Sequence, residues 1–171
     1  SYWTQPVNKE NPIKRFKENT QFKRQMGFDF SHVIIKNTNN FGYFSDVDFY
    51  SKNITNKPTV VVIGDSFVEA SQVSNNDSFH GLLSKKFPLI NIYPIGTSGD
   101  SLSQYLAYAK FAKEKFNPDK FLFTQKDADI GEPFAGPRTI WKLNGLLNNG
   151  LNLDFKPNEA LVYGMVGTGA T

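Results

Sequence analysis

Cysteine is absent from the 171 residues, and histidine occurs only twice, as His32 and His80. Without cysteine the chain can form no disulfide, no cysteine nucleophile and no thiolate zinc site. Clusters of His, Asp and Glu with metal-ligand spacing are also missing. We therefore expect no metal, and the sequence suggests no cofactor.

Long apolar runs and strongly unbalanced charge are missing as well. No run approaches the roughly 20 residues that span a bilayer, so we expect no direct membrane insertion in this segment. The net charge is only +3, and no long basic stripe occurs, so the sequence favours no nucleic-acid partner. Lys and Arg cluster early in the chain, as Lys14, Arg15, Lys17, Lys23 and Arg24.

The remaining composition is that of a globular protein, with 39% hydrophobic and 20% charged residues. This length can bury a substantial core in one domain. We expect an arm and lead-in over residues 1–58, which packs its aromatic side chains on the main sheet, and an α/β domain over residues 59–171. The aromatic residues of this arm are Tyr2, Trp3, Phe16, Phe22, Phe28 and Phe30.

One stretch organises the chain, the β-branched run Val60–Ile63 that leads directly into Gly64-Asp65-Ser66. Such a run is typical of a strand buried on both faces of a parallel sheet. Gly64 permits a tight turn where the strand stops. Asp65 and Ser66 then lie at the carboxyl end of the strand, where open α/β sheets bind ligands.

Strands and helices alternate after Ser66. Helical spacing of Phe79, Leu82, Leu83 and Phe87 predicts an amphipathic helix, which Asn76 or Asp77 would cap and Pro88 would end. The further predictions are a strand over 89–95, a glycine-rich turn over 96–101 and a strand over 121–124. Between this turn and the last strand we expect a helix that begins at Ser101 and stops at Asn117-Pro118-Asp119. Its predicted inner face comprises Leu102, Tyr105, Ala109, Ala112 and Phe116. This alternation indicates a parallel sheet with right-handed crossovers, and therefore a three-layer α/β sandwich.

Outside residues 59–124 the patterns that indicate secondary structure are shorter. Residues 31–36 predict a strand, 37–42 a turn and 53–58 a loop. Near the carboxyl end, Asn149-Gly150 is a candidate hairpin turn, and residues 160–163 predict one more strand.

The block Gly64-Asp65-Ser66 after a buried strand resembles the first motif of the SGNH (GDSL-type) hydrolase family. Gly96-Thr97-Ser98-Gly99-Asp100 resembles the glycine block of that family, and Asn40-Phe41-Gly42-Tyr43 is similar to SGNH domains that modify cell-envelope polysaccharides. The resemblance covers about residues 38–130. It implies the SGNH fold, which is flavodoxin-like, and a serine esterase or O-acetyltransferase that acts on acyl esters of carbohydrate.

In this resemblance Ser66 is the nucleophile, and the N–H groups of Ser66 and Gly99 are oxyanion donors. The family takes a third donor from an asparagine after the third strand. This chain has Gln125, Lys126 and Asp127 there, and the side chain of Gln125 or Lys126 would have to replace the asparagine. The alternative is that Gln125, Lys126 and Asp127 are solvated loop residues without a role in the site.

The family's Asp-x-x-His block, which supplies the catalytic base, has no counterpart in this sequence. His80 falls on a predicted helix and His32 beside an apolar run, so both are interpreted as structural. The predicted sheet is also one or two strands short. Two explanations compete: the chain is a fragment of a longer protein with an incomplete C-terminal part, or it is a degenerate member without the base.

Several other residues have structural interpretations. We expect Asp65 and Asp100 to cap helices and Glu69 to lie on the surface. Trp141 and Tyr163 are expected in the core rather than at a sugar site.

Three functions therefore remain open. The first is the esterase or acetyltransferase, with a carbohydrate or polysaccharide ester as substrate and an extracytoplasmic location implied by the resemblance alone. The second is an inactive SGNH-fold carbohydrate-binding or scaffold domain. The third is a flavodoxin-like binding domain with a phosphate at residues 96–99.

Overall fold

A four-stranded parallel sheet forms the centre of the computed structural model, which describes residues 4–8, 13–125 and 160–164. The strand order is β4-β3-β5-β6, and every neighbouring pair is parallel. These strands are β3 (Thr59–Gly64), β4 (Asn91–Gly96), β5 (Lys120–Gln125) and β6 (Ala160–Gly164). The predicted parallel sheet is thus confirmed, including a strand close to residues 160–163.

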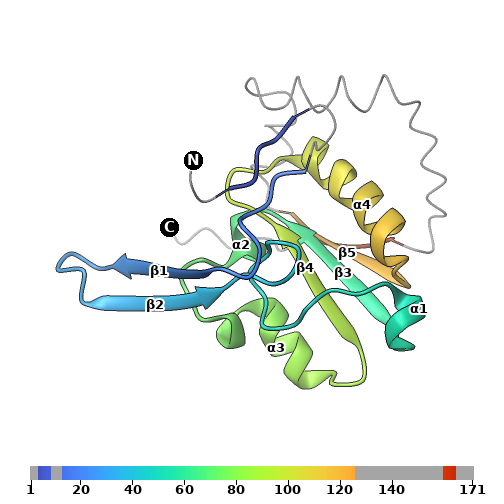
Figure 1. Cartoon of the computed structure of the whole chain (residues 1–171), viewed down its shortest axis with the longest axis horizontal. Coiled ribbons are helices and arrows are strands. Elements are labelled where there is room, and N and C mark those ends of the chain that lie inside the picture. Colours follow the sequence, from blue (N-terminus) through green and yellow to red (C-terminus); the bar gives the residue numbers. More distant parts are fainter. Residues whose placement is uncertain (1–3, 9–12, 126–159, 165–171) are drawn as a thin grey trace.

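Helices cover both faces of this sheet (Figure 1). Alternate residues of a strand face opposite sides, so Val61 and Ile63 pack with α4 (Leu102–Phe116), whereas Val62 packs with Val68 and Leu83 on the other side. That second side carries α2 (Ser66–Glu69) and α3 (Phe79–Lys86). The fold is therefore the predicted three-layer α/β sandwich.

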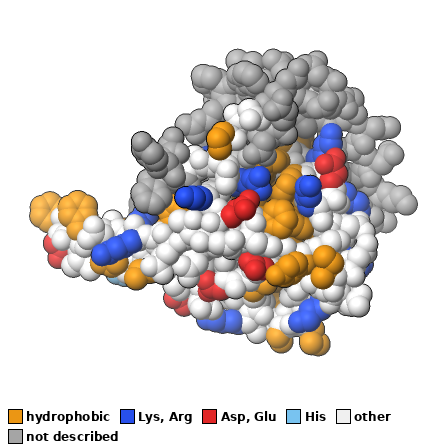
Figure 2. All heavy atoms as spheres, viewed as in Figure 1, with side chains coloured by type: hydrophobic (Ala, Val, Ile, Leu, Met, Phe, Trp, Pro, Cys, Tyr) orange, Lys and Arg blue, Asp and Glu red, His pale blue; other side chains and the backbone are white. Residues whose placement is uncertain are grey.

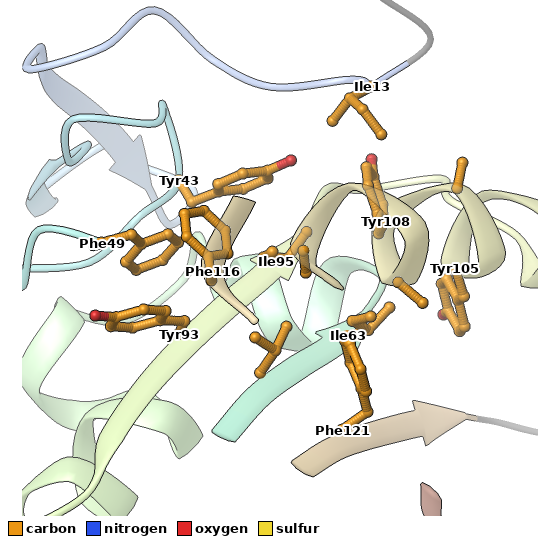
Figure 3. Packing of buried hydrophobic residues seen from close by; sticks show 14 residues of the cluster. Ile13, Tyr43, Phe49, Ile63, Tyr93, Ile95, Tyr105, Tyr108, Phe116 and Phe121 are labelled. Atoms are coloured by element: carbon orange, nitrogen blue, oxygen red, sulfur yellow. The ribbon is translucent and has the colours of Figure 1, made fainter. Parts of the chain in front are cut away.

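The larger core lies between the sheet, α4 and the loop that precedes β3 (Figure 3). Aromatic rings dominate it. Phe49 stacks on Tyr93 with ring centroids 4.3 Å apart, and Phe116 meets both rings edge-on. The packing joins residues 43–49 to the sheet and fixes the lead-in on the same face as α4.

Helix α4 follows the predicted spacing, but it begins at Leu102 rather than at Ser101. Ser101 is its N-cap, and the backbone N–H of Ser101 donates to Gln104 Oε1 at 2.7 Å. Asn117, in the left-handed conformation, ends the helix. Of the predicted inner face, Tyr105, Ala109, Ala112 and Phe116 are buried and Leu102 is half-buried.

Helix α3 differs from its prediction at the cap and on its apolar face. Ser78 is the N-cap, because Asn76 and Asp77 form a short 3₁₀ helix, η1 (Asn75–Asp77). Only Leu83 of the predicted stripe packs on the sheet side. The other three, Phe79, Leu82 and Phe87, are exposed, because the short helix lies at the edge of the sheet over β4.

Two elements near the amino end were not predicted. Residues 52–55 form a helical turn, α1 (Lys52–Thr55), within the expected loop. The strand β2 (His32–Asn37) was expected, but its partner β1 (Gln21–Met26) was not, since polar residues dominate β1. Together they make an antiparallel hairpin that projects from the body (Figure 1).

The predicted packing of the arm on the main sheet is therefore wrong for most of its described aromatic residues. Phe28 and Phe30 are exposed at the hairpin turn. Phe16 and Phe22 pack on Phe44 in a cluster of their own, with centroid distances of 4.8 and 5.3 Å. Tyr2 and Trp3 lie outside the described residues, and the division at residue 58 stays a prediction.

Candidate functional site

Ser66 is the first residue of α2, immediately after the carboxyl end of β3. Asp65 is the N-cap, and its Oδ1 accepts the backbone N–H of Phe67 at 3.0 Å, as predicted. Ala70, in the left-handed conformation, ends the helical turn. The Ser66 side chain is partly exposed, and its hydroxyl forms no hydrogen bond with another described residue. The strand end therefore presents a serine hydroxyl that other groups can reach.

The loop over 96–100 lies beside α2, because β4 is the neighbour of β3 and both end at the same level. Gly64 and Gly96 are register partners. The Glu69 carboxylate accepts the backbone N–H of Ser98 and attaches the loop to α2. Glu69 is buried, so its predicted surface position is wrong; this contact across two elements explains the burial.

Gly99 lies in this loop with φ +78°, and no atom lies within 4 Å of the position that a Cβ would take. Within the described residues, nothing accepts the N–H of Gly99. The structure thus brings Ser66 and Gly99 to the same edge of the sheet, on adjacent connections. Their assignment as nucleophile and oxyanion donor stays a prediction.

Asp100 stabilises the 96–100 loop through its buried carboxylate. Its Oδ2 accepts the Thr97 N–H at 2.9 Å, the Thr97 hydroxyl at 2.6 Å and the Tyr108 hydroxyl at 2.7 Å. Burial and the Asp100 carboxylate raise the pKa of Tyr108 well above its ordinary value. The predicted helix-capping role of Asp100 is therefore wrong, since Ser101 caps α4 and Asp100 binds within its own loop.

Lys14 completes this arrangement from the amino-terminal segment. Its Nζ donates to the Ser98 carbonyl at 2.6 Å and lies 3.8 Å from Asp100 Oδ1. The backbone carbonyl of Lys14 accepts the Tyr108 hydroxyl at 3.2 Å. Sequence reasoning counted Lys14 only among the basic residues, because 84 residues separate it from Ser98 and no local pattern links them.

Lys36 of β2 binds the other end of α2. Its Nζ donates to the carbonyls of Ala70 at 2.7 Å and Glu69 at 3.1 Å, and it lies 4.9 Å from the centroid of the Phe44 ring. The ammonium group thus satisfies carbonyls at the C-terminal end of the helical turn that begins with Ser66. Burial lowers the pKa of Lys36 to about 8, although the charges of Glu69 and Asp46 oppose that shift.

Because the folded pKa of Lys36 is about 8 and its ordinary value is 10.5, the unfolded chain binds more protons between these pH values. The contribution of Lys36 to the free energy of unfolding must then rise with pH in this window, by up to about 3 kcal/mol. Lys36→Met keeps the chain length and removes the titrating amine. We expect the free energy of unfolding of the wild type, minus that of the variant, to increase between pH 7.5 and pH 9.5.

Urea unfolding of both proteins at matched pH values checks this, through the difference between the two free energies. The window stays below the ordinary pKa of tyrosine, because buried Tyr43 and Tyr108 have raised pKa values and would lower the free energy of unfolding of both proteins above it. A difference that is constant with pH would contradict the buried charged lysine.

The third oxyanion position follows β5, the neighbour of β3 on its other side. Gln125 is the last residue of β5, so its backbone lies at the same edge of the sheet as Ser66. The preceding residue, Thr124, donates its hydroxyl to the Ile63 carbonyl at 3.3 Å. Lys126 and Asp127 lie outside the described residues, as do Trp141 and Asn149-Gly150; Tyr163 lies in β6.

The two histidines occupy very different places. His32 is exposed at the start of β2, on the projecting hairpin. His80 is buried in α3, and its Nδ1 lies 3.2 Å from Ser78 Oγ. Burial, together with the charge of Lys36, lowers the pKa of His80 to about 3. An imidazole with this pKa is a weak base, which agrees with the structural role predicted for His80.

In the described ranges, no three His, Cys, Asp or Glu side chains are grouped so that they could hold a metal ion. The described helices also include none that is long and apolar enough to span a bilayer.

Fold and site together define an α/β protein with a parallel sheet, a partly exposed serine after one strand and a glycine loop after the next. No family model matches the chain, and no curated protein matches it. Among solved structures it is similar to AlinE4, described as an SGNH-hydrolase family esterase, and to a mutant of the same esterase. Each comparison gives a TM-score of 0.40 and 18% identity over 54% of this chain. The chain spans about half of AlinE4, 52% of its length.

Proposed function

We propose that this chain is a serine esterase or O-acetyltransferase that acts on acetyl esters of carbohydrate, with Ser66 as nucleophile. The observation that carries the proposal is the position of Ser66, a partly exposed hydroxyl fixed after a buried strand, beside the Gly96–Asp100 loop. The order of the Gly64-Asp65-Ser66 and Gly96–Asp100 blocks, which resembles the SGNH family, supports it too.

In the proposed reaction, Ser66 Oγ attacks the acetyl carbonyl carbon and its proton passes to a base. The carbonyl oxygen becomes negatively charged and accepts the N–H groups of Ser66 and Gly99; such a donor contributes roughly 3–4 kcal/mol to transition-state stabilisation. The sugar hydroxyl leaves with a proton, and an acetyl-serine remains. Water then releases acetate, or a second hydroxyl takes the acetyl group.

The two connections on which these donors lie are held rigidly. Lys36 binds the carbonyls at the end of α2, and Glu69 joins α2 to Ser98. Asp100 binds Thr97 within the glycine loop. Preorganised donors of this kind cost no rearrangement when charge develops on the substrate. The third donor belongs to Gln125 or Lys126 in this proposal.

The carbohydrate substrate and an extracytoplasmic location belong to the same proposal. They are supported by the resemblance of Asn40-Phe41-Gly42-Tyr43 to polysaccharide-modifying domains. In the structure this block is structural: Asn40 Oδ1 and Nδ2 bind the backbone of Phe49, each at 2.9 Å. Tyr43 is buried in the larger core. The block therefore supports the lead-in loop and leaves substrate contact to other residues.

A second function is favoured by the histidines. His80 is buried and His32 lies on the hairpin, so neither offers the base that the Ser66 hydroxyl requires. An inactive SGNH-fold domain that binds or scaffolds carbohydrate needs no such base. The competing proposal is thus a binding domain that uses the same edge of the sheet.

One experiment separates the two functions. The chain is incubated with p-nitrophenyl acetate, and separately with a fluorophosphonate that reacts with activated serines. For the enzyme we expect acetate release and a phosphonate mass increase on the peptide that contains Ser66. The esterase would be overturned if neither acetate release nor phosphonate labelling occurs. Retardation of the chain in a gel that contains acetylated polysaccharide would then support the binding domain.

A further inference from the structure

The β1–β2 hairpin ends in a defined turn. Gly27 accepts the N–H of Phe30 at 3.3 Å, and Asp29 Oδ1 accepts the N–H of Ser31 at 3.1 Å. Gly27 has φ +90° and Phe30 has φ +55°. A left-handed conformation is unfavourable for an aromatic residue, and such outliers concentrate at binding and switch segments. The turn thus keeps Phe30 in an unfavourable backbone conformation while its ring faces solvent.

Large apolar side chains gather at this turn and along one face of the hairpin. Phe28 is fully exposed, and Phe30 exposes 64% of its surface. Val33 and Ile35 follow on the outward face of β2, at 42% and 55%. Figure 2 shows this hydrophobic end of the hairpin far from the body, with a cationic side chain behind it. The described part of the chain covers none of these four side chains.

Positive charge accompanies the exposed apolar side chains. Lys23 lies directly opposite Ile35 in the antiparallel register, so the two side chains share the outward face. Arg24 follows on the other face, where its guanidinium donates to Ser71 Oγ. Within residues 13–37 the formal charge is +4, whereas the whole chain carries +3. The hairpin and the segment that leads into it, residues 13–37 together, therefore carry a net positive charge at least as large as that of the whole chain.

A second copy of this chain is a poor partner for such a hairpin. Its edge strand β1 carries two positive charges, Lys23 and Arg24, which oppose pairing of this edge with the same edge of another copy. An anionic surface with an apolar layer beneath its charges matches both the positive charge and the exposed apolar side chains of the hairpin. Aromatic side chains favour the interface between lipid headgroups and acyl chains, and nearby Lys and Arg side chains bind anionic headgroups.

We propose that the β1–β2 hairpin binds the surface of an anionic lipid bilayer, with Phe28 and Phe30 inserted at headgroup depth and Lys23 on the phosphates. Binding is peripheral, and no segment crosses the bilayer. Val33 and Ile35 approach the headgroups on the same face as Lys23. Asp29 lies between Phe28 and Phe30 in the sequence, and its carboxylate accepts the backbone N–H of Ser31 within the turn.

The test is co-sedimentation of the whole chain with vesicles of phosphatidylglycerol and phosphatidylcholine, compared with vesicles of phosphatidylcholine alone. We expect binding to the anionic vesicles that falls with added salt. The double variant Phe28→Ser/Phe30→Ser should lose at least about tenfold in binding. Lys23→Gln should lose about fivefold.

The matched control is Phe79→Ser/Leu82→Ser, which removes two exposed apolar side chains from α3 and should bind vesicles as the wild type does. Urea unfolding confirms that each variant is folded. Equal binding by the Phe28/Phe30 variant and the wild type would overturn the proposal. So would the absence of binding to the anionic vesicles. A concentration-dependent dimer that the Phe28/Phe30 variant abolishes would then show that the hairpin binds a second copy.

Discussion

Ser66→Ala is expected to reduce acetyl-ester hydrolysis by about a thousandfold or more and to leave the free energy of unfolding within about 0.5 kcal/mol of wild type. The large loss follows because Oγ is the atom that forms the bond to the acetyl carbon in the proposed reaction. The small change in stability follows because the hydroxyl binds no other described residue, whereas Asp65 caps the helical turn independently of Ser66. Initial rates on p-nitrophenyl acetate and urea unfolding measure the two quantities.

Ser98→Ala is the matched control. Ser98 lies on the facing loop with an exposed side chain, and its contacts to Lys14 and Glu69 use only its backbone. The control should therefore keep both rate and stability. Hydrolysis that survives Ser66→Ala but falls with another substitution at this edge would show that a different group attacks the ester. Loss of rate and stability together in Ser66→Ala would indicate that the serine is structural.

The elements that were predicted well carry their signal within a few consecutive residues. The β-branched run of β3 and the end of α4 at Asn117 are of this kind. Buried strands and capped helices depend on neighbours in sequence, so a local pattern suffices. The parallel order then followed from the alternation of strands and helices.

The errors concern side chains whose partners are distant in sequence. Glu69 resembles a surface residue until the loop after β4 presents the Ser98 N–H to it. Asp100 resembles a helix cap until Tyr108 and Thr97 surround its carboxylate. In the sequence, Lys36 is an ordinary lysine of a short strand. In the structure, its ammonium group donates to the Ala70 carbonyl at the end of α2. In each case tertiary packing, which no short pattern encodes, decides burial and role.

The glycines show the same limit in a different form. Gly64 was expected to permit a tight turn, but it has no positive φ, and its place is decided by space. A Cβ there would overlap with Thr124 Oγ1 and Val68 Cγ2. Gly99 is the reverse case, with a positive φ and open surroundings. Sequence alone marks both as turn glycines, and only the structure separates close approach from backbone conformation.

Gly96→Ala is therefore expected to lower the free energy of unfolding by about 3 kcal/mol or more. The added Cβ would overlap with the carbonyl oxygen of Gly64, lie 2.9 Å from its carbonyl carbon and lie 3.0 Å from the Cβ of Val68. Two of these three atoms are backbone in the adjacent strand, so no rotamer change relieves the overlap. Strands β3 and β4 would have to separate where they carry Ser66 and the glycine loop.

Gly99→Ala is the comparison that isolates this cause. The added Cβ has no atom within 4 Å, so the expected loss is only the cost of alanine in a left-handed backbone conformation, about 1 kcal/mol. Urea unfolding of both variants against wild type measures the two losses. If Gly96→Ala loses no more than Gly99→Ala, the close approach of β3 and β4 at their carboxyl ends is wrong. The proposed site would lose its geometry with it, because Ser66 and Gly99 face the same space only if these two strand ends lie side by side.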